Sequence, residues 1–276
     1  MPDREFGVSD FGISVGGGAR AAGEDVAEVG EVGEAREAEK EGTSPGTETS
    51  REPTQDARFE MAHEMRRITS AMVGIPISDT DIAAAAASLR EVADGLERTA
   101  GPGRRLRAQP DPVGHPQEFF PTSPVIGFAN PVAPPVVVEA VDGELRGTAY
   151  FDYQYEGPPT CVHGGVLAMV FDEMLGAANI VAGSPGMTGT LTIRYRKPTP
   201  LRTPLRLEAR FMGREGRKIR TYGAIFHGEM LTAEAEGIFI ELIPQRFLAI
   251  VTENSDSPEA VEQVRADARR LGFTDS

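Results

Sequence analysis

The sequence contains one cysteine and no tryptophan among its 276 residues. A single cysteine cannot form a disulfide within the chain, which excludes a disulfide-stabilised secreted scaffold and fits a reducing compartment. The first thirty residues also lack the basic start and the apolar run of a signal peptide. We therefore expect a cytoplasmic protein.

An excess of basic charge is also absent, because the formal net charge is −14. Residues 1–57 hold 14 acidic and 5 basic residues and so account for −9 of it. This balance argues against nucleic acid as a partner, since nucleic-acid binding depends on basic side chains. It says little about small anionic ligands, which respond to local charge.

The longest apolar run extends from Val162 to Ala182 and is long enough to cross a bilayer. Asp172 and Glu173 lie at its centre, and charged side chains at the centre of a bilayer are costly. We therefore expect no membrane span and interpret the run as a buried helix of 18–20 residues.

The composition divides the chain into five regions. Residues 1–57 are rich in Gly, Glu, Ala, Ser and Thr, with few large apolar side chains, which predicts a disordered acidic extension. Residues 58–109 are predicted to be a helical N-terminal region. Prolines recur every few residues over 110–135, which predicts an irregular connector. A folded domain should occupy 136–243, and 244–276 should be a C-terminal tail able to form one short helix.

Within the helical region, periodic apolar residues predict helices over 58–74 and 79–99. The second helix follows Ser78-Asp79, which are residue types that cap helix N-termini.

The folded domain is predicted to have the element order β-β-α-β-β-β-β. Two strands flank Asp142-Gly143, a type I′ turn signal. After the apolar helix come four alternating segments bounded by Gly or Pro, which are 188–198, 204–216, 217–228 and 229–242. A helix that is apolar on nearly every side must be wrapped, so we expect an α+β fold with an antiparallel sheet curved around it. The sheet edges need cover, and a second copy is the simplest cover.

Asp172 is a candidate general base or nucleophile. Its neighbours one turn away are uncharged, so we expect a desolvated carboxylate with a raised pKa unless a partner pairs with it. Those neighbours are Ala168, Met169, Leu175 and Gly176. A structural acid at a dimer contact is the alternative. Glu173 satisfies the same argument, and the sequence does not separate the two.

The helix is preceded by His163-Gly164-Gly165. Each glycine in the first turn costs up to about 1 kcal/mol of helix stability but lets a ligand approach free backbone N–H groups. Such groups can hold a developing oxyanion, although a simple loop-to-helix turn is the alternative. His163 and Asp172 are nine residues apart, so they point to opposite sides with about 13 Å of rise between them. Both can act together only across two subunits.

Three motifs in order resemble the hotdog-fold acyl-CoA thioesterases of the PaaI-like branch. They are His163-Gly164-Gly165 with Asp172 and Gly176, then MTGTLTIRYRKPTPL from Met187, then EGRK from Glu215. The resemblance covers about residues 125–242 and has no counterpart before residue 110. It implies a hotdog fold, in which a curved antiparallel sheet wraps one long helix, assembled as a homodimer or a dimer of dimers.

The resemblance also implies a role for each matching residue. Asp172 would be the catalytic carboxylate, supplied from the partner subunit as base or nucleophile. Gly165, with Gly164, would polarise the thioester carbonyl, His163 would orient the thioester, and Thr188 would lie near the attacking water. The phosphates and nucleotide of coenzyme A would contact Arg194, Arg196, Arg217 and Lys218, although any one of these alone is more simply a solvated strand residue.

The implied function is hydrolysis of acyl-CoA to free acid and coenzyme A, with no metal and no cofactor. A non-catalytic acyl-CoA-binding or regulatory module is the alternative. A hydratase is disfavoured because no histidine follows Asp172 closely, and Cys161 is a poor nucleophile because His163 is only two residues away. The four histidines have no metal-ligand spacing. Phe119, Phe120 and Phe128 suggest medium or long fatty acyl substrates, which would place the enzyme in fatty acid and lipid metabolism.

Overall fold

The computed structural model describes residues 53–99 and 120–243, together with residues 249, 252, 253, 261, 262, 265 and 266. The acidic extension up to residue 52, the segment 100–119 and most of the C-terminal tail therefore lie outside the described residues. The predictions of disorder over 1–57 and of a C-terminal helix remain predictions.

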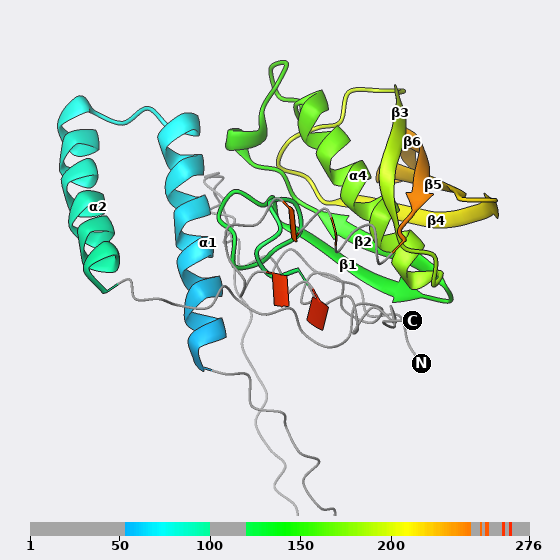
Figure 1. The fold of residues 1–276 in the computed structure, drawn as a ribbon. Helices are drawn as coiled ribbons and strands as arrows, with labels where there is room; N and C mark the ends of the chain where they lie inside the picture. The colour runs from blue at the N-terminus through cyan, green and yellow to red at the C-terminus, as the bar shows by residue number, and fades with distance from the viewer. Residues whose placement is uncertain are drawn as a thin grey trace, which may run out of the picture.

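Two helices lie beside the main body, as the sequence predicted. Helix α1 spans Pro53–Gly74 and helix α2 spans Asp79–Thr99. Helix α1 begins at a proline, which is well tolerated in a first turn, and so includes residues assigned above to the acidic extension. The Ser78 hydroxyl accepts the Asp81 N–H at 3.2 Å and caps α2, as predicted. Together the two helices form the α1–α2 hairpin (Figure 1).

The main body is a six-stranded antiparallel sheet whose elements follow the predicted order β-β-α-β-β-β-β. The strands lie in the order β1-β2-β4-β5-β6-β3. Asp142 and Gly143 both have positive φ, 54° and 82°, as a type I′ turn requires. The strands are β1 (Val136–Val141), β2 (Glu144–Ala149), β3 (Gly186–Tyr195), β4 (Leu205–Glu215), β5 (Lys218–His227) and β6 (Met230–Glu241).

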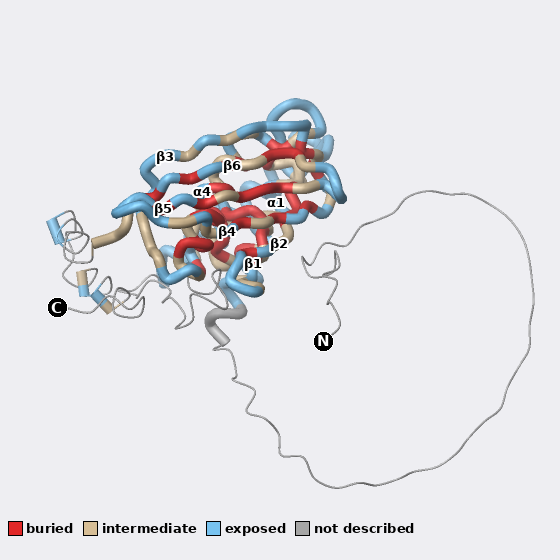
Figure 2. The backbone as a smooth tube through the Cα atoms, turned by 90° about the vertical axis from the view of Figure 1, so that its right-hand side faces the viewer, coloured by how far each residue is buried: buried red, intermediate tan, exposed pale blue. Residues whose placement is uncertain are grey.

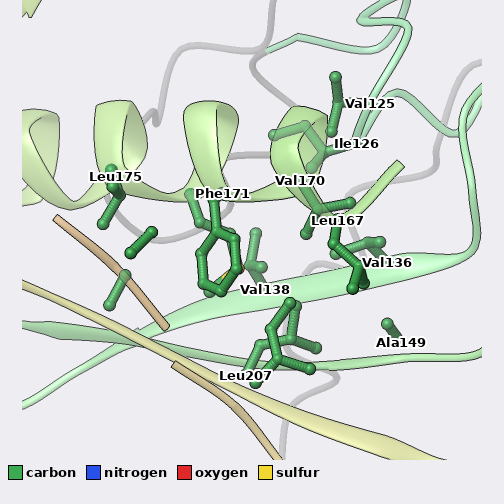
Figure 3. Close-up of a cluster of buried hydrophobic side chains, with 14 of the residues drawn as sticks. Val125, Ile126, Val136, Val138, Ala149, Leu167, Val170, Phe171, Leu175 and Leu207 are labelled. Atoms are coloured by element: carbon green, nitrogen blue, oxygen red, sulfur yellow. The ribbon is translucent and has the colours of Figure 1, made fainter. Parts of the chain in front are cut away.

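Helix α4 (Gly164–Val181) packs on one face of this sheet and contacts strands β2, β3, β4, β5 and β6. Phe171 and Leu175 are fully buried beneath the helix, and Leu207 of β4 lies opposite them (Figure 3). Burying each such side chain contributes roughly 1.5–3 kcal/mol. Gly223 and Gly237 lie under Leu175, where an added Cβ would come within 3.1 Å of its methyl groups. Glycine at these two positions allows the helix to lie close to the sheet.

The wrapping of α4 is incomplete in a single chain. Strand β3 is an edge strand, and most of its residues are exposed (Figure 2). The side of α4 that carries Gly165 and Asp172 is also exposed. By length and composition alone α4 could cross a membrane, but eight of its residues are buried in the core of this domain. The architecture is the α+β hotdog arrangement expected from the sequence, with one edge open.

Helix α1 is docked on the body. Phe59 packs edge-to-face on Phe128 with ring centroids 5.8 Å apart, and Arg66 Nη1 donates to the Asn130 carbonyl at 2.9 Å. At its C-terminal end, Gly74 is so close to the Tyr153 ring that a Cβ would lie 2.1 Å from it. The orientation of α1 is therefore fixed at both ends.

One of the three phenylalanines from which the acyl substrates were inferred, Phe128, packs against Phe59 of α1. Phe119 lies outside the described residues, and Phe120 is exposed.

Candidate active site

The start of α4 is held from both sides by segments distant in sequence. The His163 N–H donates to the Tyr155 carbonyl at 2.8 Å, and the Val162 N–H donates to the Thr199 carbonyl at 2.9 Å. Tyr155 ends the short 3-10 helix η2 (Tyr153–Tyr155), and Thr199 follows β3. The backbone entering the helix is thus fixed before the first helical residue.

The Gly165 N–H, the predicted oxyanion donor, already has an acceptor. His163 is the N-cap residue of α4, and its Nδ1 accepts this N–H at 3.0 Å. Nδ1 accepts this hydrogen bond through its lone pair, so Nε2 is the ring nitrogen that remains available to donate. A Cβ on Gly165 would lie 3.1 Å from Nδ1, which explains a glycine here. A substrate carbonyl oxygen can accept a hydrogen bond from the Gly165 N–H only if it displaces the His163 imidazole.

Tyr195 contacts the same helix start and was not identified from the sequence. Its hydroxyl donates to the Gly164 carbonyl at 2.8 Å, and a Cβ on Gly164 would lie 3.3 Å from the tyrosine ring. The alternation of apolar and polar residues along β3 could have identified Tyr195. Leu191, Ile193 and Tyr195 lie on the face of the strand that is turned toward α4. The end of β3 thereby positions the first turn of the helix.

Asp172 lies near the other end of β3. The Thr188 hydroxyl donates to Asp172 Oδ1 at 2.7 Å. Thr188 would point away from α4 under strict alternation, but a β-bulge between Thr188 and Thr190 turns it toward the helix. The structure thus brings together two of the predicted site residues, through an irregularity that the sequence did not reveal.

The expected desolvation of Asp172 is wrong for the single chain, in which this side chain is exposed. Its helix neighbours are apolar, but they bury the opposite side of the helix against the sheet. Asp172 instead lies beside the edge strand β3, where among the described residues no further strand pairs with β3.

Glu173 is the desolvated acid of the pair. Burial raises the pKa of its carboxyl, the Asp172 charge raises it further, and a hydrogen bond from Ser123 partly opposes both. The Ser123 hydroxyl donates to Glu173 Oε1 at 3.2 Å and accepts the N–H groups of Val125 and Ile126. Glu173 therefore fixes the connector onto α4, and the structure separates the two acids where the sequence could not.

The four predicted cations fall into two groups. Arg194 forms an ion pair with Glu236 at 2.6 Å, and Arg196 Nε donates to Glu234 at 2.9 Å. Hydrogen bonds from Tyr222 and Arg196 lower the pKa of Glu234. These pairs join β3 to β6 on the face of the sheet away from α4.

The second group lies at the opposite end of β6. Arg217 Nη2 reaches the Glu241 carbonyl at 3.4 Å, and Lys218 is exposed in register with Ile240. Glu234 and Ile240 are six positions apart on β6, which corresponds to a distance of about 20 Å along the strand. A single chain does not bring all four cations together.

Among the described residues, no group of three His, Cys, Asp or Glu side chains could hold a metal ion. Cys161 lies half-buried in the turn before α4, where its N–H donates to the Pro158 carbonyl.

No protein-family model matches the chain. Acyl-coenzyme A thioesterase THEM4 from Xenopus laevis is 36% identical over 91 residues, 32% of this chain and 41% of that protein. The chain thus spans about two fifths of the length of this curated relative.

Two solved structures are also similar to this chain. The crystal structure of a thioesterase superfamily protein matches with 35% identity and a TM-score of 0.60, over 66% of this chain and 94% of that one. The PaaI protein from the phenylacetic acid degradation operon of E. coli is 16% identical over 39% of this chain and 80% of its own, with a TM-score of 0.37.

Proposed function

The chain belongs to the thioesterase superfamily, and from that premise we propose that it hydrolyses acyl-CoA thioesters to the free acid and coenzyme A. The named activity of the THEM4 relative supports this substrate class. One observation carries the proposal: a carboxylate on the central helix, Asp172, is hydrogen-bonded to Thr188 on an uncovered edge strand.

The catalytic centre, in this proposal, forms between two copies of the chain. Thr188 contacts Asp172 at one end of β3, and Tyr195 contacts the start of α4 near the other, about 23 Å further along the strand. If β3 pairs antiparallel with β3 of a second copy, the Thr188 end of each strand meets the Tyr195 end of the other. Asp172 of one subunit would then face Gly165 and His163 of its partner. The same pairing covers the open edge and removes Asp172 from water.

The chemistry assigned to these groups is as follows. Asp172 takes a proton from water while the water oxygen adds to the thioester carbonyl carbon, or its carboxylate adds directly. The carbonyl oxygen displaces His163 Nδ1 from the Gly165 N–H, which then stabilises the oxyanion. Collapse breaks the C–S bond, and the coenzyme A thiolate takes the proton that Asp172 removed from water. Where the Asp172 carboxylate has added directly, collapse leaves an acyl–Asp172 anhydride, and water hydrolyses it to the free acid and the Asp172 carboxylate while one proton of that water goes to the thiolate. A backbone donor of this kind contributes about 10²–10³ to the rate.

The cations provide the anchor for coenzyme A. Antiparallel pairing of β3 brings Arg194 and Arg196 of one subunit toward the Gly186 end of the partner strand, beside which Arg217 and Lys218 lie. Phosphates would compete with Glu234 and Glu236 for the arginines, and arginine binds them through paired hydrogen bonds. Medium and long fatty acyl groups are the proposed substrates.

The test uses the purified full chain with acyl-CoA substrates from acetyl to palmitoyl, and Asp172→Asn beside Glu173→Gln. The proposal expects wild-type turnover, a loss of about 10²–10⁴-fold in Asp172→Asn, and a change of a few fold at most in Glu173→Gln. Equal turnover by the wild type and Asp172→Asn would contradict it.

A non-catalytic acyl-CoA-binding module is the second candidate. It is favoured by the occupied Gly165 N–H and by the pairing of Arg194 and Arg196 with glutamates. Tight acyl-CoA binding by the wild type with no release of coenzyme A would support this function and exclude hydrolysis.

A further inference from the structure

Helix α2 is uncovered along its whole length. It runs for 21 residues, and none of them is buried in the described structure. Most helices in proteins obtain their stability from packing an apolar face rather than from propensity. The chain therefore contains a well-formed helix whose packing partner is missing from the part of the chain that the structure describes.

The apolar residues of α2 form a narrow seam at coiled-coil spacing. Its five positions recur at intervals of three and four and are Ile82, Ala85, Leu89, Val92 and Leu96. The four larger side chains are 37–58% exposed. Such spacing over two heptads is that of a helix made to pack against another helix.

The flanks of the seam favour close helix pairing. Small, uncharged residues border it, namely Ala86, Ser88, Ala93 and Gly95. The charged residues of the last three turns all lie on the opposite side, namely Arg90, Glu91, Asp94, Glu97 and Arg98. Small flanking residues let two helices approach each other. The predominance of acids and the narrow seam argue against a membrane surface, which favours a wide apolar face and a basic polar one.

Helix α1 presents a second exposed stripe beside the first. The stripe continues into the residue after the helix, recurs at intervals of three and four, is 38–58% exposed, and consists of Met61, Met65, Ile68 and Met72 of α1 with Ile75. This stripe lies opposite the face that carries Phe59, Arg66 and Gly74, which dock α1 on the body. Both stripes are exposed in the part of the chain that the structure describes.

We propose that the α1–α2 hairpin is an interface between two copies of this chain, in which α2 pairs antiparallel with α2 of the second copy about Leu89. A two-fold axis there places Ile82 opposite Leu96, Ala85 opposite Ala93 beside Val92, and Leu89 opposite its own copy, so the seam is complementary to itself. The two α1 stripes flank this pair and extend it toward a four-helix arrangement.

The charged residues at the two ends of α2 support pairing with a second copy of the chain. Antiparallel pairing places Asp79 and Asp81, in the first turn of one α2, beside Arg98 in the last turn of the other. It also sets the helix dipoles in opposition, which is favourable.

This interface is separate from the one at β3. The α1–α2 hairpin and β3 lie on opposite sides of the body (Figure 1). A chain that uses both surfaces assembles as a dimer of dimers. The hairpin interface does not depend on the proposed hydrolysis, and its test measures assembly rather than turnover.

The test is disulfide trapping in the full-length chain with Cys161→Ser, so that each added cysteine is the only one. Leu89→Cys is expected to form a covalent dimer under mild oxidation, well before Asp94→Cys, which lies on the opposite face of α2. A mixture of Ile82→Cys and Leu96→Cys chains should give a mixed dimer. Both positions are exposed, so these substitutions leave the fold intact, which circular dichroism checks.

Two results would overturn the proposal. One is cross-linking of Leu89→Cys no faster than that of Asp94→Cys. The other is trapping within one chain when Leu89→Cys is combined with Ile68→Cys, which would show that α2 packs on its own α1. As a second measurement, Leu89→Glu with Val92→Glu should halve the assembly mass in light scattering, and an unchanged mass would count against the interface.

Discussion

The Thr188 hydroxyl donates a 2.7 Å hydrogen bond to Asp172 across the gap between edge strand β3 and helix α4. The bond fixes one carboxylate oxygen and leaves the other open at the uncovered edge. Thr188→Val should therefore lower kcat/KM about 10- to 100-fold, the usual worth of a hydrogen bond to a charged group. Thr188→Ser keeps the hydroxyl and should recover most of the rate. If Thr188→Ser were as impaired as Thr188→Val, the loss would reflect packing rather than the hydrogen bond.

Stability should depend on pH through Glu173. Its pKa in the folded chain is raised by burial, so the folded state holds a proton that the unfolded state has released. Stability is then full below the ordinary pKa of 4.5 and falls as pH rises from there through the raised value.

Glu173→Gln removes this titration and keeps a partner for Ser123. Its melting temperature should match that of the wild type at pH 4 and exceed it at pH 8, as measured by thermal unfolding across this range. A wild type that gains stability over the variant as pH rises would contradict the assignment of the buried acid.

The close approach of α4 to the sheet predicts a severe effect at Gly237. A Cβ there would lie 2.5 Å from the Phe239 ring and 3.1 Å from Leu175. Gly237→Ala should lower the free energy of unfolding by about 1–3 kcal/mol through overpacking. Gly176→Ala is the matched control, since its Cβ would meet Phe239 at an ordinary 3.7 Å. Equal stability of the two variants in chemical denaturation would refute this packing.

Local sequence signals determined most of the fold. The turn signal at Asp142-Gly143 and the alternation of the later segments were sufficient to predict the order of the elements along the chain. The nine-residue separation of His163 and Asp172 also excluded a dyad within one helix. These features depend on neighbouring residues, which is why the sequence alone predicted them.

Features that depend on distant contacts were missed. The bulge that turns Thr188 toward α4 and the Tyr195 hydroxyl bond to Gly164 both arise from strand pairing. Asp172 and Glu173 could be separated only by knowing that the connector covers Glu173 while β3 leaves Asp172 open. The contact between Phe128 and Phe59, which lies 69 positions earlier in the chain, was also not predicted.

The central claim is that one subunit supplies Asp172 and the other supplies the helix start. Complementation tests it with two inactive variants, Asp172→Asn and Gly165→Pro, the latter lacking the N–H in a first turn that tolerates proline. Random mixing by co-refolding makes half of the dimers hybrids, each with one intact site of two, so the mixture should regain about a quarter of wild-type turnover. If the mixture stays as inactive as its two components, each site is built within one chain and the account is wrong.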